Sequence, residues 1–423
     1  MKRTEDQPEA TDETESVEAL PWFQRTFLSL RHGPFRLFWL SNFVFAIGMM
    51  VQFTARGWLT VQLTDSALVL GLVEGTFGVT FALGSIPAGI LADRRNRRNL
   101  LIAGDSVALV AVVLVGVLIA TDAIEIWHVL VASAVGGVLF ALRIPTGQAM
   151  TARLVPAPHM MNAIALNQTA QSLPSVAGPA VGGVLIAVVG IAGAYFVTTG
   201  AFVIGLMMML GVAASFGSID RGAVKSVRED FREAVDYVLA HRDLLSLTAA
   251  MLIPFILGQS YVLLLALFVE QELGLGPAAF GVLSASIGLG AVVGAMTVAT
   301  FGEERQIGRI MFLGIVATGV AGIVYGLSHS VLLTAGVLFV AGAGESALFA
   351  AYDTLLLIRL PDEMRGRVMG LMFTLVALFP IGAAIAGAVA DQVGLRTVAI
   401  AEGVIILAMA GVAWKVVLSR ISS

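Results

Sequence analysis

The sequence predicts an all-α integral membrane protein with twelve transmembrane helices in two pseudo-symmetric six-helix halves. Hydrophobic residues make up 58% of the 423-residue chain and charged residues only 13%, against roughly 25% charged in a soluble protein. From residue 35 onward, apolar segments follow one another, each about long enough for the roughly 20 helical residues that cross a bilayer core. A repeat at about half the chain length relates the first set of segments to the second.

The polar segments divide this pattern into five parts. Residues 1–34 begin with an acidic stretch that has too little apolar surface to fold and should be disordered. They end in a short helix on the inner membrane surface, indicated by Trp22, Phe23, Phe27 and Leu30. The other parts are a helical half at 35–215, a cytoplasmic linker with a surface helix at 216–243, a second half at 244–418 and a cytoplasmic tail at 419–423.

The boundaries of the spans are predicted from the length of the apolar segments, the charges in the loops and the positions of glycine and proline. The expected spans are 36–63, 68–92, 100–120, 127–152, 160–189, 192–215, 244–271, 278–301, 309–327, 331–357, 366–390 and 397–418. With both termini in the cytoplasm, all of the 25 basic residues except Arg56, Arg143 and Arg396 fall on cytoplasmic segments. The positive-inside rule therefore supports this topology, and we expect a multi-pass protein of the inner (plasma) membrane.

The internal repeat is seen most clearly in the positions of glycines. A shift of 210 residues lays Gly71, Gly78 and Gly84 on Gly281, Gly288 and Gly294. Two similarly oriented halves, related by an axis along the membrane normal, leave such a pattern. In the second copy the charged loop after the second span is reduced to Glu303, Glu304 and Arg305, so any switching role should rest mainly on the first copy.

That charged loop, between the second and third spans, holds one carboxylate and four arginines, which cannot sit in hydrocarbon. It resembles the signature loop of the major facilitator superfamily, Gly-x-x-x-Asp-Arg-x-Gly-Arg-Arg, at Gly89, Asp93, Arg94, Arg97 and Arg98. Asn96 stands where the pattern has glycine, and we expect it to adopt a positive φ there. The resemblance implies a twelve-helix bundle that moves solute by alternating access, with the loop as a conformational switch.

The fifth span combines a polar stripe with a second motif. The stripe lies on one helical face and consists of Asn167, Gln168, Gln171, Ser172 and Ser175. Such stripes face a wet cavity or supply hydrogen bonds between helices. The motif resembles the Gly-Pro-x-x-Gly-Gly core of proton-linked exporters of the superfamily at Gly178, Pro179, Gly182 and Gly183. Pro174 stands where the full motif has a further glycine, and small residues four apart also serve plain packing.

Two charges in the first two spans should pair. Arg56 and Glu74 stand nine residues on either side of Asp65 in the intervening turn, so an antiparallel hairpin brings them to similar depth. We expect a structural ion pair near the outer face, with a substrate role as the alternative.

Four further residues are candidates for proton coupling. Arg143 resembles the lone arginine that superfamily exporters carry in the fourth span, and its alternative role is a counter-ion for Asp105. Glu345 lies near the middle of the tenth span with no basic residue close in sequence. A buried carboxylate without a partner can take up a proton, although a hydrogen bond to a neighbouring helix is the alternative. Asp353 ranks lower because it could pair with Arg359.

Composition excludes several other functions. The chain has no cysteine and only five scattered histidines, so we expect no cofactor and no metal site. We find no ATP-binding phosphate loop, no basic groove for nucleic acid and no catalytic constellation. Within the superfamily, Arg143-Ile144-Pro145 and the run from Ala163 to Asn167 are similar to macrolide-efflux and enterobactin-type exporters.

The sequence thus predicts a monomeric exporter that exchanges a small apolar or amphipathic compound, drug-, macrolide- or siderophore-like, for protons. Uptake or facilitated diffusion by the same fold is one alternative. A non-transporting membrane sensor or assembly partner is another, and it would be expected to carry a soluble domain.

Overall fold

The computed structural model describes residues 26–213, 227–376 and 379–413, which form helices and the turns between them, without a strand among these residues. The elements are η1 (Leu28–Arg31), α3 (Gly33–Leu63), α4 (Ala67–Arg94), α5 (Arg97–Ala120), α6 (Ile126–Leu154), η2 (Ala157–His159), α7 (Met160–Leu210), α8 (Val227–Ala240), α9 (Arg242–Leu263), α10 (Leu265–Leu267), η4 (Phe268–Glu272), α11 (Pro277–Phe301), α12 (Glu304–Leu327), α13 (Val331–Arg359), α14 (Asp362–Val376), α15 (Phe379–Val393) and α16 (Leu395–Ala413). Trp22 and Phe23 of the expected interfacial helix lie outside the described residues, as do the acidic stretch before them, linker residues 216–226 and the tail at 419–423, whereas Leu30 lies in η1.

The predicted all-α membrane class is confirmed. Ten helices among the described residues are long and apolar enough to cross a membrane. One of them, α7, covers the fifth and sixth expected spans, which meet at Gly190 with φ +75°, a conformation that glycine adopts without the steric cost of a Cβ. The count of twelve spans stays a prediction.

Two expected spans differ from the helices observed. The seventh ends early, since α9 stops at Leu263 and the short helices α10 and η4 follow. The eleventh corresponds to two helices, α14 and α15, separated by residues 377–378, which lie outside the described residues.

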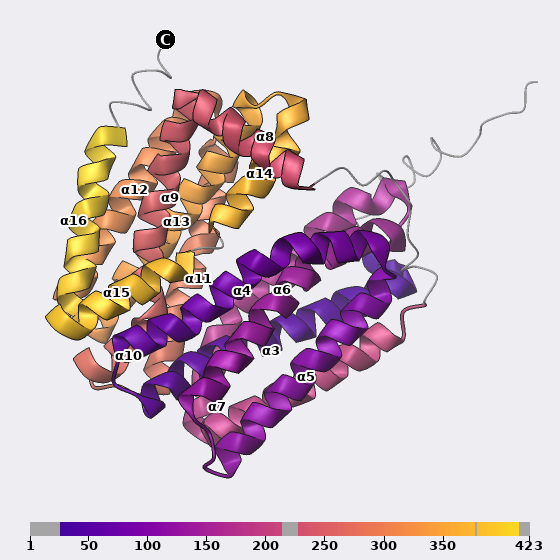
Figure 1. The fold of residues 1–423 in the computed structure, drawn as a ribbon, viewed down its shortest axis with the longest axis horizontal. Coiled ribbons are helices and arrows are strands. Elements are labelled where there is room, and N and C mark those ends of the chain that lie inside the picture. Colours follow the sequence, from indigo (N-terminus) through magenta and orange to yellow (C-terminus); the bar gives the residue numbers. More distant parts are fainter. Residues whose placement is uncertain (1–25, 214–226, 377–378, 414–423) are drawn as a thin grey trace, which may run out of the picture.

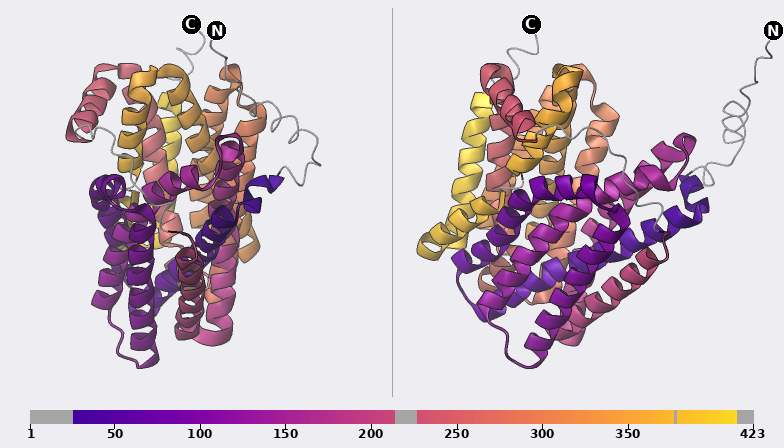
Figure 2. Two further views of the ribbon diagram at one scale, coloured as in Figure 1. Left: turned by 90° about the vertical axis from the view of Figure 1, so that its right-hand side faces the viewer. Right: turned by 45° about the vertical axis from the view of Figure 1, so that its right-hand side comes forward.

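The helices gather in two groups (Figure 1). One group contains α3 to α7, and the other contains α9 and α11 to α16, with α8 lying across one end of the second group. The views agree that the groups approach each other at one end and diverge toward the other (Figure 2). We call these ends the closed face and the open face.

Close backbone contacts join the groups, α7 against α11 and α4 against α15. A Cβ on Gly183 would stand 2.5 Å from the Pro277 carbonyl oxygen, and one on Gly71 would stand 2.6 Å from that of Ala383. Gly281, the repeat partner of Gly71, likewise lies against α7. Small residues thus allow the helices to pack closely at equivalent places in the two copies of the repeat.

At the closed face, Asp391 at the end of α15 reaches the first turn of α4. Its carboxylate accepts hydrogen bonds from the Ser66 hydroxyl at 2.6 Å and from the backbone N–H groups of Ala67 at 2.7 Å and Leu68 at 3.2 Å. Gln271 also donates to the Asp65 carbonyl at 3.1 Å. A carboxylate at a helix N-terminus satisfies otherwise unpaired donors, so Asp391 latches the two groups together at this face.

At the open face, two arginines of the charged loop contact the first group, while the side chain of Asp93 lies outside the described part of the chain. Arg98 donates to the carbonyls of Val212 and Leu210, and Arg97 donates to that of Ala149. The expectation for Asn96 was wrong, because its φ is −58° and its side chain caps α5 by accepting from the Asn99 N–H at 3.1 Å. Asparagine is a favoured N-cap, and this role replaces the glycine turn.

Candidate functional site

A cavity of about 170 Å³ lies between α3, α6 and α7 of the first group. Aromatic, methionine and other small or apolar side chains form much of its wall, and amides with one arginine form the rest. The lining residues are Asn42, Phe45, Ala46, Met49, Met50, Phe140, Arg143, Ile144, Gly147, Gln148, Asn167, Gln171 and Pro174. A few polar groups in an apolar wall are typical of small-molecule sites, and methionine adapts its shape to different ligands.

A polar network runs along this wall. Arg143 pairs with Asp105 and donates to the Asn42 side-chain oxygen at 2.9 Å. The Asn42 side-chain amide donates to the side-chain oxygen of Asn167 at 3.4 Å. The Asn167 amide in turn donates to the Thr151 hydroxyl at 3.4 Å. The network therefore connects the predicted arginine in the fourth span to the predicted polar stripe in the fifth.

The arginine is also held by an aromatic face. The Arg143 guanidinium carbon lies 3.8 Å from the Phe45 ring centroid, and Phe45 stacks on Phe202 at 4.1 Å. Asp105 keeps one carboxyl oxygen without a hydrogen-bond partner among the described residues. Cation–π contact and ion pairing together fix the guanidinium at the cavity wall, and the two roles weighed for Arg143 both remain open.

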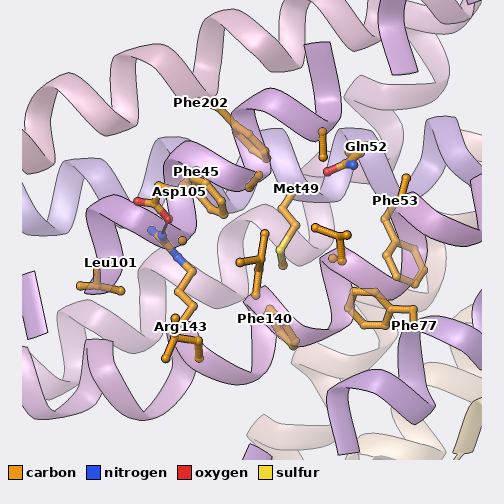
Figure 3. A pocket seen from close by; sticks show the side chains of 18 of the residues that line it. Phe45, Met49, Gln52, Phe53, Phe77, Leu101, Asp105, Phe140, Arg143 and Phe202 are labelled. Carbon is orange, nitrogen blue, oxygen red and sulfur yellow. Dashed lines mark hydrogen bonds and ion pairs between the residues drawn. The ribbon is translucent and has the colours of Figure 1, made fainter. Parts of the chain in front are cut away.

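A second cavity of about 60 Å³ adjoins the first and shares Phe45, Met49, Phe140 and Arg143 with it. Figure 3 shows Arg143 and Asp105 pointing toward each other at one end, with Phe53 and Phe77 at the other end. The two cavities together form a continuous lining from the arginine toward the aromatic pair.

Arg56 borders the second cavity and forms an ion pair with Glu74. The Arg56 Nη2 and Nε atoms donate to the two Glu74 oxygens at 2.5 and 3.2 Å. Both side chains are buried, and the guanidinium lies 4.4 Å from the Phe53 ring centroid and 5.1 Å from that of Phe77. The two charges therefore contact each other, and the structural role expected for the pair stays a prediction.

The structure divides the predicted residues of the fifth span by role. Asn167 and Gln171 line the larger cavity, whereas Gln168, Ser172 and Ser175 line neither cavity. In the neighbouring glycine motif, Gly178 packs against Met50 and Gly182 against Thr54, both on α3, and Gly183 faces α11. The motif glycines therefore occupy helix contacts, and Pro179 approaches α11 through its carbonyl oxygen.

Glu345 lies in the second group, away from both cavities. It is 6% exposed, and its Oε2 accepts from the Gln259 side chain on α9 at 2.7 Å. Its Oε1 has no partner among the described residues and faces the backbone of Gly258. The carboxyl group is thus half satisfied and has no counter-ion in the part of the chain that the structure describes. Asp353, half-buried on α13, forms no ion pair with Arg359 among these residues.

Sequence reasoning missed the contribution of the first span to the site. Asn42, Phe45 and Met49 lie on one side of α3 and line the larger cavity. The available signal was Asn42 itself, together with Gln52, as amides in a mostly apolar span.

The sequence matches the family described as "Transmembrane secretion effector" over residues 24–423. It is 25% identical over 385 residues to the "Multidrug efflux pump Tap" of Mycolicibacterium fortuitum, covering 86% of this chain and 91% of that protein. It is 24% identical over 360 residues to the "Enterobactin exporter EntS" of Shigella flexneri, covering 83% of each.

Solved structures agree on the fold. A bacterial homolog of the human lysosomal transporter Spinster, in an inward-facing and unoccupied conformation, superimposes with a TM-score of 0.69 at 16% identity, covering 95% of this chain and 98% of that one. The nucleoside transporter NupG superimposes with a TM-score of 0.75 at 11% identity, covering 90% and 98%.

Proposed function

Because the chain belongs to the transmembrane secretion effector family of the major facilitator superfamily and is a transporter rather than an enzyme, we propose that it exports a small apolar or amphipathic organic compound in exchange for protons. The observation that carries this proposal is the cavity between α3, α6 and α7. Phe45, Phe140 and two methionines can contact an apolar body, while Arg143 and the amides can bind a polar or anionic group. The efflux names of two relatives favour export over uptake.

The proposal assigns proton coupling to Glu345. Its carboxyl group is buried, lacks a counter-ion among the described residues and has one unpaired oxygen. Protonation removes the charge that burial makes costly. The ion pair of Arg143 and Asp105 is the second candidate. A proton could bind Asp105 in place of Arg143, and an anionic substrate could bind Arg143 in place of Asp105.

We further infer that residues 35–215 and 244–418 are the two moving halves, joined by a cytoplasmic linker that includes α8. With both termini in the cytoplasm of a bacterial inner membrane, the open face is the inner one, and the structure corresponds to an inward-open state. Arginines at the open face and an acidic closed face with Asp391 favour this orientation. The transporter acts as a monomer.

The test is transport by the purified chain in lipid vesicles and in an efflux-deficient bacterial host. We expect the host to tolerate a subset of a panel of amphipathic toxic compounds, and this tolerance should disappear when a protonophore collapses the gradient. Uptake of the same compounds, or unchanged transport with the protonophore present, would contradict export in exchange for protons. A lack of any flux in vesicles would favour a sensor.

The conformational switch motif gives a direct prediction. We expect Asp93→Asn to lower transport roughly 2- to 30-fold at unchanged membrane abundance, because a carboxylate that meets a helix terminus in the opposite access state contributes about 0.3–2 kcal/mol. Vesicle flux per protein molecule measures this effect. Arg95→Gln, in the same loop at a position that the motif does not specify, is the control and should transport normally. Unchanged flux in Asp93→Asn would leave the loop as a topology signal only.

The closed face gives a second prediction. Asp391→Ala removes the carboxylate that caps α4 from the other half, a type of interaction worth about 0.5–2 kcal/mol, which shifts the access equilibrium roughly 2- to 30-fold toward outward opening. Since the chain has no native cysteine, spin labels at Thr121→Cys and His329→Cys, in exposed turns of the two groups at the closed face, report the opening by pulsed electron paramagnetic resonance.

Asp65→Ala is the matched control for the latch. Asp65 lies in the same turn, and its carbonyl, not its side chain, bonds to the other half. We expect the label distances of this variant to match those of the parent, whereas Asp391→Ala should add a longer distance. Identical distances in all three proteins would show that Asp391 does not hold the face closed.

A further inference from the structure

The second group of helices holds a buried carboxyl group besides Glu345. Glu402 lies on α16 and is 7% exposed. Its Oε2 atom has no hydrogen-bond partner among the described residues. An unpaired charge in a bundle interior is costly, and ionisable residues at such positions usually have a function.

Glu402 borders a cavity of about 10 Å³, which is close to the smallest volume that holds one water molecule. Residues from α9, α12, α16 and the α10–η4 segment enclose this cavity. The lining residues are Tyr261, Leu264, Phe268, Tyr325, Leu395, Val398, Ala399 and Glu402. The buried Tyr261 hydroxyl also lacks a partner among the described residues, so a carboxyl group and a phenol open onto the same water-sized space.

The charged groups on the surrounding elements are engaged elsewhere. Arg396, on the same helix, donates to Glu272 at 2.5 Å and to the carbonyls of Gly326 and Ser328. Asp391 on α15 binds the first turn of α4. Of the titratable groups that line the cavity itself, Tyr261 and Tyr325 accompany Glu402, and no cation lines it among the described residues.

Helix α9 packs against both helices that carry these buried carboxyl groups, α13 with Glu345 and α16 with Glu402. Gln259 donates to Glu345 at 2.7 Å, Ser260 lies beside Glu402, and Tyr261 lines the cavity. Successive residues of a helix point to different sides, so Gln259 bonds to Glu345 and Ser260 lies beside Glu402, while Tyr261 is within electrostatic reach of both carboxyl groups. The cavity also lies near the closed face, because Leu395 begins α16 directly after the turn that follows Asp391.

We propose that Glu402 is a proton-binding site, distinct from Glu345, which exchanges protons with the closed face through the water-sized cavity at Tyr261. The proposal rests on the proton-coupled export proposed above. In the uptake step, a hydrated proton protonates the Glu402 carboxylate and leaves a water molecule, and release reverses this step. Tyr261 is a positioning residue, since its hydroxyl can orient the water against the carboxyl group.

Infrared difference spectra test the site without relying on transport. Purified protein in lipid vesicles is stepped in pH, and the carboxylic-acid C=O band reports protonation. We expect Glu402→Gln to lose one band that the parent and Glu345→Gln both retain, and Tyr261→Phe to shift that band. A spectrum of Glu402→Gln that is identical to the parent's would overturn the proposal. Glu402→Asp keeps a carboxyl group and should show this C=O band at a displaced frequency. If the Gln variant does not fold, this displacement tests whether the band belongs to Glu402.

A transport measurement on the same vesicles separates this site from the general mechanism. With a pH-sensitive dye inside, we expect Glu402→Gln to move fewer protons per substrate than the parent while keeping downhill substrate exchange. An unchanged proton-to-substrate ratio would remove Glu402 from the coupling. If the parent moves no protons but Glu402 still titrates in the infrared spectrum, proton-coupled export is wrong and the proton site at Glu402 stands.

Discussion

Replacing Glu345 with glutamine should abolish export against a concentration gradient while downhill exchange continues. The membrane potential supplies roughly 2.3 kcal/mol per charge per 100 mV, which supports about a 50-fold substrate gradient for each proton exchanged. Glutamine keeps the size of the side chain and can still accept from Gln259, but it cannot carry a proton. We therefore expect the accumulation ratio to fall from tens to about one in energised vesicles, with substrate binding retained.

Glu363→Gln is the matched control, since Glu363 is an exposed carboxylate at the start of α14. It should transport like the parent, which excludes a general effect of removing an acidic group from this half. If Glu345→Gln still accumulates substrate and a protonophore abolishes that accumulation, another group carries the proton. Glu402, proposed above as a separate proton-binding site, would then be tested first, followed by Asp105, which is bound to Arg143 at the cavity wall, and by Asp353.

The sequence was sufficient for features that depend on distance along the chain. Apolar run length predicts the helices because the bilayer thickness sets their length. The Arg56 and Glu74 pair follows from equal spacing around the Asp65 turn, since an antiparallel hairpin converts spacing into depth. Gly190, where the two merged spans meet, lies between the segments expected at 160–189 and 192–215.

Features that depend on which helices pack together could not be predicted from distances along the chain. Asp391 bonds to Ser66 across 325 residues, and no local pattern marks it as a cap for α4. Glu402 lies between Ala401 and Gly403 in an apolar run, which does not say whether its side chain faces lipid, a cavity or another helix. Asn96 was assigned by analogy to glycine, although its position before α5 also suits an N-cap.

Neutralising Arg56 or Glu74 alone should strongly destabilise the protein. The two side chains are 7% and 4% exposed, and removing one partner of a buried ion pair costs about 3–5 kcal/mol because the other charge is left unpaired. We expect Arg56→Gln and Glu74→Gln each to lower the melting temperature and the yield in detergent. The double variant should recover much of this loss, giving a non-additive cycle. Fluorescence-detected size exclusion after heating measures all four proteins.

The surface pair Arg232 and Asp236 provides the control cycle. These side chains are 84% and 68% exposed, lie 3.7 Å apart, and should contribute no more than about 0.5 kcal/mol.

Arg56→Lys adds a further distinction, because lysine keeps the charge but loses the two-pronged contact with Glu74 and the contact with the Phe53 ring. A stable Arg56→Lys that transports normally would assign the pair to charge balance alone. Additive losses in the Arg56 and Glu74 cycle would instead mean that each residue acts by itself, and a stable double variant that cannot transport would favour the substrate role weighed against the structural one.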